Sequence, residues 1–459
     1  MQKKSTFLQS LFVIATLGII MFCAIVVYDA SPHIPMIFGC AVSAIMALRA
    51  GYSWQEIQDA MIDGIHQALE SLIILMMIGV LVAIWIQSGA VPTIICYGLQ
   101  LLSPRFYLVT TMVICSVISM AVGSWGTAGT VGLAFMGIAA ALEIPLPLAA
   151  GAIISGCYVG DKLSPLSDST NLSSAVTGVN IFENVRQMFP VAGIAYLIAL
   201  ILYTMIGFRY CSQDTQALTG VTEYILQLHA NFWISPINLL PLLLLIVCVV
   251  AKIPAIPSIG IGILSATVLS CCTQGSSIGS ILVIGFSGYV SHTGNQMMDT
   301  LLTAGGIEAM LYSVSIIIVA MMFGGIMEHT KQMEALMRPI MEKIHSIKAL
   351  VSTTVVSCVL VNLILPEQYI AIALPGRMLF QEYDRHGISR KYLAIALGAG
   401  GAATSALVPW NTCGVYMSGV LGVSTFAYIP FAFFNLLMPF MMIAVSWSIR
   451  KGSPAQQHF

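Results

Sequence analysis

The chain is built from apolar runs long enough to cross a lipid bilayer, and these runs limit its possible folds more than any other feature. Of its 459 residues, 58% are hydrophobic and only 8% are charged, whereas a soluble protein of this length needs a far more charged surface. The sequence therefore predicts an all-α polytopic membrane protein. We expect full spans at residues 11–28, 34–49, 69–89, 189–208, 235–251, 255–272, 308–327 and 426–447, with amphipathic stretches along the interface at residues 51–66, 91–103, 277–290 and 330–346.

One polar segment, residues 160–171, interrupts the apolar pattern with two carboxylates, an ammonium group, four hydroxyls and an amide. Charged side chains at membrane depth are costly, so they usually mark a path for ions or protons. Pro165 and the polar run should divide a helix into two half-helices, which predicts a discontinuous helix at residues 146–178.

Residues 106–142 form two apolar arms that are too short for two crossings, with a break rich in glycine and hydroxyl residues between them. Irregular backbone at membrane depth is tolerated only where protein or a wet cavity satisfies it. A re-entrant hairpin with its tip at residues 124–129 is the simpler interpretation.

The order of a hairpin followed by a broken helix recurs 242 residues later in the chain. With this shift Thr170 corresponds to Thr412 and Ser71 to Ser313. Five crossings and one hairpin in each half would make the halves antiparallel, so the sequence predicts two inverted repeats. The first repeat would be residues 1–208, with scaffold spans in 11–89, the hairpin 106–142, the broken helix 146–178 and a span at 189–208. A linker at 209–232 would lead to the second repeat at 233–459, with scaffold spans in 235–327, a hairpin at 348–380, a broken helix at 391–421 and a span at 426–447.

Lysine and arginine residues favour one side of this topology, and only Arg105 and Arg209 fall clearly on the other side. The positive-inside rule then places both termini in the cytoplasm of a protein of the plasma membrane.

The candidate site residues surround the predicted breaks. Asp161 and Asp168 could each hold Na⁺ or a proton, and a carboxylate that takes either exchanges them by competition. The other candidates are the oxygen-bearing Ser124, Thr127, Thr170 and Asn171, the second-half residues Glu367, Asn411 and Thr412, and the supporting charges Lys162 and Arg377.

Each candidate also has a structural alternative. Asp161 could pair with Lys162 and merely stabilise the break, and Asp168 could cap the second half-helix. Ser124 could belong to close helix packing, and Glu367 could pair with Arg377. Glu70 lies at an apparent span end, where a solvated acid is normal.

Several classes of protein are excluded by missing motifs. The sequence has no phosphate-binding loop of an ATPase and no serine–histidine arrangement for an intramembrane protease, so we expect a transporter without a cofactor rather than an enzyme. A net charge of −1 indicates no nucleic-acid partner. The duplicated broken helices argue against a channel.

At these residues the chain resembles the NhaC-type Na⁺/H⁺ antiporter family, within the larger ion transporter superfamily. The motifs lie at residues 124–130, 160–172, 368–378 and 410–414, of which the second is long and specific. The resemblance implies secondary active transport with Na⁺ and H⁺ as coupled ions, a scaffold and a moving transport domain, and a homodimer. Pro366 and Glu367 differ from the small or polar residues more typical of the family before Gln368.

We therefore expect Na⁺/H⁺ antiport by alternating access. Some relatives within this superfamily exchange organic anions such as malate and lactate. Ion-coupled exchange of a small organic acid or amino acid therefore stays open as the alternative.

Overall fold

A computed structural model describes residues 5–28, 30–101, 103–210, 215–251, 253–295, 298–299, 302–341 and 346–447. This part of the chain contains 21 α-helices, and its only β pairing is a single bridge between Tyr289 and Ala304. Six helices are long and apolar enough to cross a membrane, or up to ten spans if each bent helix pair counts as one. The predictions of an all-helical fold and of many spans are confirmed.

The first part of the chain contains α1 (Phe7–Phe22), α2 (His33–Arg49), α3 (Trp54–Gln87), α4 (Ala90–Leu101), α5 (Tyr107–Thr127), α6 (Leu133–Ala141), α7 (Leu146–Lys162), α8 (Asp168–Thr177), α9 (Ile181–Tyr210) and α10 (Thr215–Asn231). The second part contains α11 (Leu240–Val250), α12 (Ala255–Thr273), α13 (Ile278–Ser287), α15 (Ile307–His329), α16 (Gln332–Met341), α17 (Ile347–Ile364), α18 (Gln368–Arg385), α19 (Arg390–Leu397), α20 (Thr412–Leu421), α21 (Thr425–Tyr428) and α22 (Phe433–Val445).

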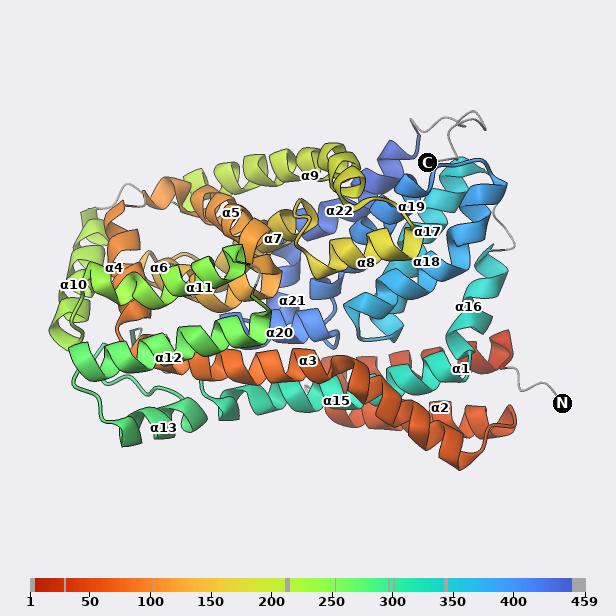
Figure 1. Cartoon of the computed structure of the whole chain (residues 1–459), viewed down its shortest axis with the longest axis horizontal. Helices are drawn as coiled ribbons and strands as arrows, with labels where there is room; N and C mark the ends of the chain where they lie inside the picture. Colours follow the sequence, from red (N-terminus) through yellow and green to blue (C-terminus); the bar gives the residue numbers. More distant parts are fainter. Residues whose placement is uncertain are drawn as a thin grey trace.

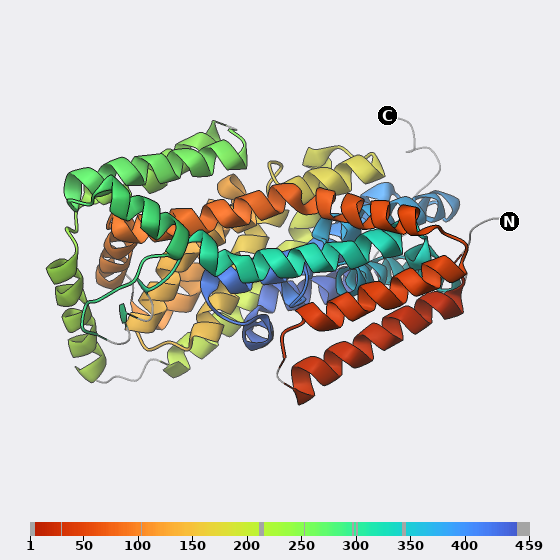
Figure 2. The ribbon, with the colours of Figure 1, turned by 90° about the horizontal axis from the view of Figure 1, so that it is seen from below.

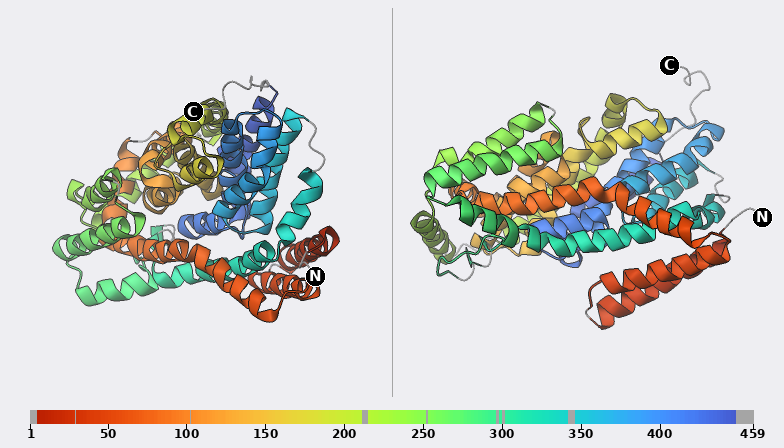
Figure 3. Two further views of the ribbon diagram at one scale, coloured as in Figure 1. Left: turned by 45° about the vertical axis from the view of Figure 1, so that its right-hand side comes forward. Right: turned by 60° about the horizontal axis from the view of Figure 1, so that its bottom comes forward.

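The helices form two groups. In Figure 1, α3 and α15 lie side by side along the lower part of the molecule, with α2, α12 and α13 packed against them and α1 packed against α2. Seen from below, the same two helices run along much of the length of the molecule (Figure 2). The hairpins and broken helices, α5 to α8 and α17 to α20, lie above this group, as the left-hand view of Figure 3 also shows.

Helix α3 differs from the sequence-based prediction, which divided it into an interfacial stretch and a separate span. It is one helix of 34 residues that begins at a capping box formed by Ser53 and Glu56. No proline interrupts it, and hydropathy alone does not end a helix. Glu70 therefore lies in the middle of a helix and not at the end of one.

Both predicted broken helices are present. Helix α7 ends at Lys162, and α8 begins after Ser167, whose hydroxyl oxygen accepts from the amide of Thr170 at 3.4 Å. In the second half, α19 continues through a π-helical turn, Gly398–Ala402, and is bent by 46° from α20. Left-handed glycines end α8 and α20, Gly178 at φ 70° and Gly422 at φ 67°.

The two hairpin regions also contain breaks, but the first is narrower than predicted. Within α5 only Gly123 leaves the helical conformation, at φ 78° and ψ 170°, and the helix resumes at once through the expected tip at residues 124–129. A single glycine suffices because this backbone conformation is open to glycine alone. In the second half, residues 365–367 link α17 to α18, and these two helices pack against each other.

The predicted linker at residues 209–232 is mostly helical. Helix α9 extends to Tyr210, and α10 packs against α4 and α6. Residues 211–214 lie outside the described part of the chain.

Candidate functional site

The broken helices and both hairpin regions border one cavity of about 530 Å³. Side chains from α3, from the segment around Pro254 and from α12 complete its wall. Five of the residues predicted from the sequence line it, namely Ser124, Asp161, Asp168, Asn171 and Glu367.

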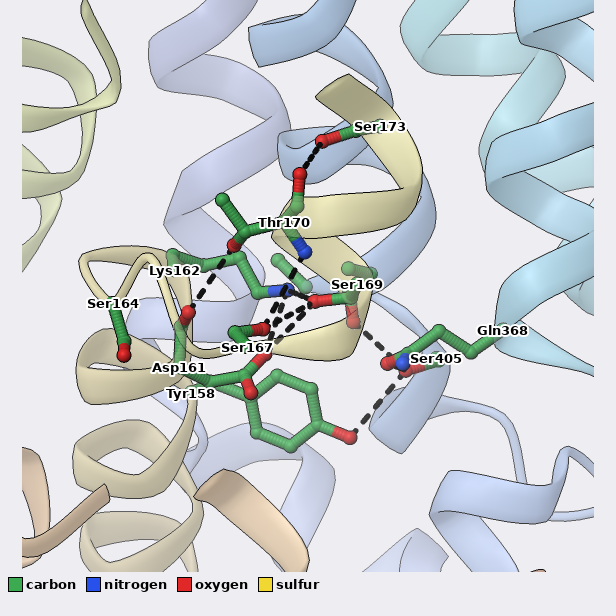
Figure 4. Close-up of polar contacts among 12 residues, drawn as sticks. Tyr158, Asp161, Lys162, Ser164, Ser167, Ser169, Thr170, Ser173, Gln368 and Ser405 are labelled. Atoms are coloured by element: carbon green, nitrogen blue, oxygen red, sulfur yellow. Dashed lines mark hydrogen bonds and ion pairs between the residues drawn. The ribbon is translucent and has the colours of Figure 1, made fainter. Parts of the chain in front are cut away.

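Asp161 and Lys162 form an ion pair at the end of α7. Asp161 Oδ2 lies 2.8 Å from Lys162 Nζ, and the two side chains are only 9% and 1% exposed. The Ser169 hydroxyl donates to Asp161 Oδ2 at 3.0 Å and also receives a short contact from the ammonium (Figure 4). The internal pair that the sequence left open as an alternative is therefore present.

The remaining polar groups of this break hold α8 in place. The Thr170 hydroxyl donates to the backbone carbonyl of Asp161 at 3.3 Å. The Asn171 amide donates to the carbonyls of Pro165 at 3.1 Å and Ser167 at 2.9 Å. Asp168 is the first residue of α8 and is exposed at the cavity, while Ser167 is the cap.

In the first hairpin the threonine hydroxyls bond within their own helix. Thr127 donates to the carbonyl of Gly123 at 2.8 Å and Thr130 to that of Gly126 at 2.6 Å. Thr127 is fully buried and does not border the cavity, whereas Ser124 does. Trp125, which also borders it, stacks on Tyr416 with ring centroids 4.1 Å apart.

Glu367 caps the start of α18 in the second hairpin. Its side chain accepts from the backbone amide of Tyr369 through Oε1 at 3.4 Å. The residue is only 3% exposed, and within the described residues Oε2 has no hydrogen-bond partner. The neighbouring Gln368 accepts from Ser405 at 3.0 Å, and Ser405 also contacts the Tyr158 hydroxyl of α7 at 3.4 Å (Figure 4).

Asn411 and Thr412 are fully buried behind the cavity wall and do not border it. Asn411 caps α20 by accepting from the amide of Cys413 at 3.0 Å, and its own amide donates to Asn362 at 3.1 Å. The backbone amide of Thr412 donates to the carbonyl of Pro366 at 2.9 Å, which ties α20 to the hairpin tip.

Arg377 is exposed on α18 and is absent from the cavity wall. The structure describes both Arg377 and Glu367 and shows no ion pair between them.

The electrostatic character of the cavity is acidic. Its lining contains four carboxylates and, among the described residues, neither lysine nor arginine. The described residues also contain no cluster of three or more histidine, cysteine, aspartate or glutamate side chains that could hold a metal ion. Any cation bound here would need hydroxyl, amide or carbonyl oxygens beside a carboxylate. The four acids are Glu70, Asp161, Asp168 and Glu367.

Comparison with known proteins gives the family. The model of the Na⁺/H⁺ antiporter family matches residues 156–448. The Na⁺/H⁺ antiporter NhaC of Alkalihalophilus pseudofirmus is 33% identical over 96% of each chain. This chain belongs to the NhaC-type Na⁺/H⁺ antiporter family. The predicted resemblance is thereby confirmed, and the protein is a secondary antiporter and not an enzyme.

Members of this family differ in what they are named to transport. The malate-2H⁺/Na⁺-lactate antiporter of Bacillus subtilis is 36% identical over 95% of this chain and 94% of its own. The arginine/ornithine antiporter ArcD of Halobacterium salinarum is 33% identical over 99% of this chain and 95% of its own. Family membership therefore leaves the solute open.

Sequence reasoning missed several residues of this antiporter's cavity wall. Gln67, Glu70 and Ser71 come from the middle of α3, and Tyr369 follows Glu367 at the second hairpin. The available signal for the α3 residues was the lack of any proline between Trp54 and Gln87, which makes one long helix and moves Glu70 away from its end.

Proposed function

We propose that this antiporter exchanges Na⁺ for H⁺ by alternating access. The observation that carries the proposal is the acidic lining of the cavity, with carboxylates from both halves of the chain and no basic side chain in the described wall. Such a wall attracts cations and repels free organic anions, because like charges in a confined, poorly screened space are costly.

The proposed site contains Asp161, Asp168 and Glu367, with Na⁺ and H⁺ competing for carboxylate oxygens. Ser124 and Asn171 would contribute oxygens at the cavity wall. Residues behind the cavity wall would shape the breaks and their charge, namely Thr127, Thr170, Asn411, Thr412 and Lys162. Arg377, which is exposed on α18, would lie outside the site.

We also propose that the halves are inverted repeats. A Cβ atom on Gly64 would lie 2.2 Å from the carbonyl oxygen of Met321, and one on Gly79 would lie 2.4 Å from that of Gly306. Shifting Gly64 by 242 residues gives Gly306, and shifting Gly79 gives Met321. The two contacts are therefore the same contact with the halves exchanged, as a two-fold axis requires.

The direction of the helices supports inversion. Gly64, early in α3, meets Met321, late in α15, and Gly79, late in α3, meets Gly306, the residue that precedes α15. The two helices therefore run antiparallel, so a two-fold axis relating them is perpendicular to both. For membrane-spanning helices this axis lies near the membrane plane, as in inverted-repeat transporters.

We also propose a location, an orientation and an oligomeric state for the protein. The distribution of lysine and arginine supports cytoplasmic termini in the plasma membrane. The family resemblance supports a homodimer. Accessibility of tags at the two ends and cross-linking in membranes would test the orientation and the dimer separately.

A second candidate is ion-coupled exchange of a small organic solute. The cavity is far larger than a single ion needs, and the aromatic side chains of Trp125 and Tyr369 border it. Its acidic lining favours a solute that carries an amine, such as an amino acid, over a dicarboxylate. One relative is named for malate and lactate and another for arginine and ornithine, so the transport experiment should include both organic acids and amino acids.

Proteoliposomes loaded with a pH-sensitive dye test the first function. Addition of Na⁺ should drive proton movement in wild type, and the double variant Asp161→Asn plus Asp168→Asn should lose it. Absence of Na⁺-dependent proton movement in folded wild type, or full activity in the double variant, would contradict the proposal. Uptake of labelled lysine, ornithine, malate and lactate in the same vesicles tests the second candidate.

A further inference from the structure

Of the three acids in the proposed site, Asp168 is exposed, whereas Asp161 and Glu367 are buried and differ in whether their charge is already balanced. Asp161 has an internal cation, because Lys162 lies 2.8 Å from its Oδ2 and is itself 1% exposed. Ser169 donates to the same oxygen at 3.0 Å. We call this buried pair closed because each charge neutralises the other. Removing either partner would leave an uncompensated charge in a low dielectric.

Glu367 has no such partner. It is 3% exposed, borders the cavity, and Oε2 accepts no hydrogen bond from the described residues. Oε1 accepts from the amide of Tyr369 at 3.4 Å, and the other groups that interact with the carboxylate, the Thr412 hydroxyl and the Gln368 amide, carry no charge. Burying a carboxylate oxygen without a partner is costly, so the fold leaves a position that a proton or a cation would stabilise.

The surrounding structure holds Glu367 in this position. The carboxylate caps α18, whose N-terminal end is partly positive. The preceding carbonyl, that of Pro366, accepts from the amide of Thr412 at the first turn of α20. Two helix starts therefore meet at the hairpin tip, and both restrict its movement relative to the cavity.

No basic group of the described wall can balance Glu367 in place of a transported cation. The wall contains neither lysine nor arginine, and Lys162 already contacts Asp161 and Ser169. Arg377 lies on the same helix but is exposed and does not border the cavity.

We infer that Glu367 is the carboxylate that contacts the transported cation, and that the Asp161–Lys162 pair is a closed ion pair that positions the break between α7 and α8. This division of roles rests on the proposed Na⁺/H⁺ exchange. It places the cation contact on the second hairpin, whereas the sequence pointed first to the polar segment of α7 and α8.

The test measures KM for Na⁺ and kcat of Na⁺-driven proton movement in proteoliposomes. Glu367→Gln should raise KM at least tenfold. The double variant Asp161→Asn plus Lys162→Met removes the closed pair as a unit, so it should lower kcat and leave KM within about threefold of wild type. Glu382→Gln is the matched control, because Glu382 lies on the same helix and pairs with Arg385 outside the cavity.

The outcomes separate the two proposals. A wild type that moves no protons with Na⁺ removes the proposed function itself. An active wild type with an unchanged KM in Glu367→Gln, or with an equal rise of KM in the pair variant, overturns only the assignment of Glu367.

A second variant covers the case in which Glu367→Gln does not fold. Glu367→Asp retains the charge and withdraws it by one methylene, so the ratio of KM for Na⁺ to KM for Li⁺ should change at least threefold. A purely structural role would leave this ratio unchanged, and that result would also overturn the assignment.

Discussion

At the residue scale, the stability of the protein depends on Asp161 and Lys162 both being present as an ion pair. Lys162→Met leaves a buried carboxylate without its cation, and Asp161→Asn leaves a buried ammonium, so we expect each to lower stability by about 3–5 kcal/mol. The double variant removes both charges and should recover a large part of this loss. Thermal unfolding of the purified protein, followed by tryptophan fluorescence, measures all three.

The control for this prediction is an exposed pair. Arg385 lies 2.6 Å from Glu382 and its side chain is 67% exposed, so Arg385→Gln should cost no more than about 1 kcal/mol. A double variant whose loss of stability equals the sum of the two single losses would show that the two charges act independently.

Asp299, in the loop between α13 and α15, gives a prediction about pH. The backbone amide and hydroxyl of Thr293, the hydroxyl of Ser291 and the amide of Gly294 donate to its carboxylate and lower its pKa to about 2. Because the folded pKa is below the ordinary value, the carboxylate stabilises this loop above about pH 4, and the contribution is lost as the pH falls towards about 2.

Hydrogen exchange checks this loop directly. The protection factors of the Thr293 and Gly294 amides should fall over that acidic range relative to amides in the middle of α15. Asp299→Asn should lower the same protection factors at neutral pH, and unchanged protection in that variant would rule out the proposed role of the carboxylate.

At the element scale, α3 and α15 approach so closely that only glycine fits at their contact. A Cβ at Gly64 would lie 2.2 Å from the carbonyl of Met321, and one at Gly325 would lie 2.1 Å from that of Ala60. Gly64→Ala must push the helices apart, so we expect it to destabilise the protein by about 1–3 kcal/mol. Gly18→Ala, in α1, is the matched control because a Cβ there meets nothing within 4 Å.

Thermal melts and transport of the two glycine variants are compared in the same lipid. Gly64→Ala should reduce both, while Gly18→Ala should be neutral or slightly stabilising, because alanine favours a helix more than glycine does. A neutral Gly64→Ala would mean that these helices can separate at no cost.

The breaks were predictable at this scale because proline, glycine and polar runs act locally. Pro165 and its polar neighbours marked the break after α7, and Gly123 immediately precedes the predicted hairpin tip. The continuity of α3 was not predicted, because a drop in hydropathy was taken as the end of a helix. The pairing of Asp161 could only be stated as an alternative, since a sequence shows that two charges are adjacent but not whether their side chains meet.

At the scale of the whole molecule, the two halves contain different charges at matching places. The shift of 242 residues carries Asp161 and Lys162 onto Ala403 and Thr404, and it carries Trp125 onto Glu367. The balanced pair therefore belongs to the broken helix of one half, and the unbalanced carboxylate to the hairpin of the other. The repeat could be proposed from sequence, but this complementarity emerges only when burial and partners are known.

The matching serines Ser71 and Ser313 give the last prediction. Ser71 borders the cavity, whereas Ser313 is 3% exposed and its hydroxyl would lie 2.8 Å from a Cβ on Gly419 of α20. If the repeats exchange conformations during alternating access, the open and closed environments of these two positions exchange as well. Ser71→Cys should then react with a membrane-impermeant maleimide in the present state, and Ser313→Cys in the opposite state.

Proteoliposomes with and without saturating Na⁺, in a Cys413→Ser background, allow the labelling of both positions to be measured by mass spectrometry of the peptides. The background removes the native thiol that borders the cavity. Labelling should rise at one position as it falls at the other. The ratio of the two labelled fractions therefore reports the conformational change independently of reagent concentration. Constant labelling of Ser71→Cys together with an unreactive Ser313→Cys under every ion condition would mean that the halves do not exchange, and that the cavity opens to one side only.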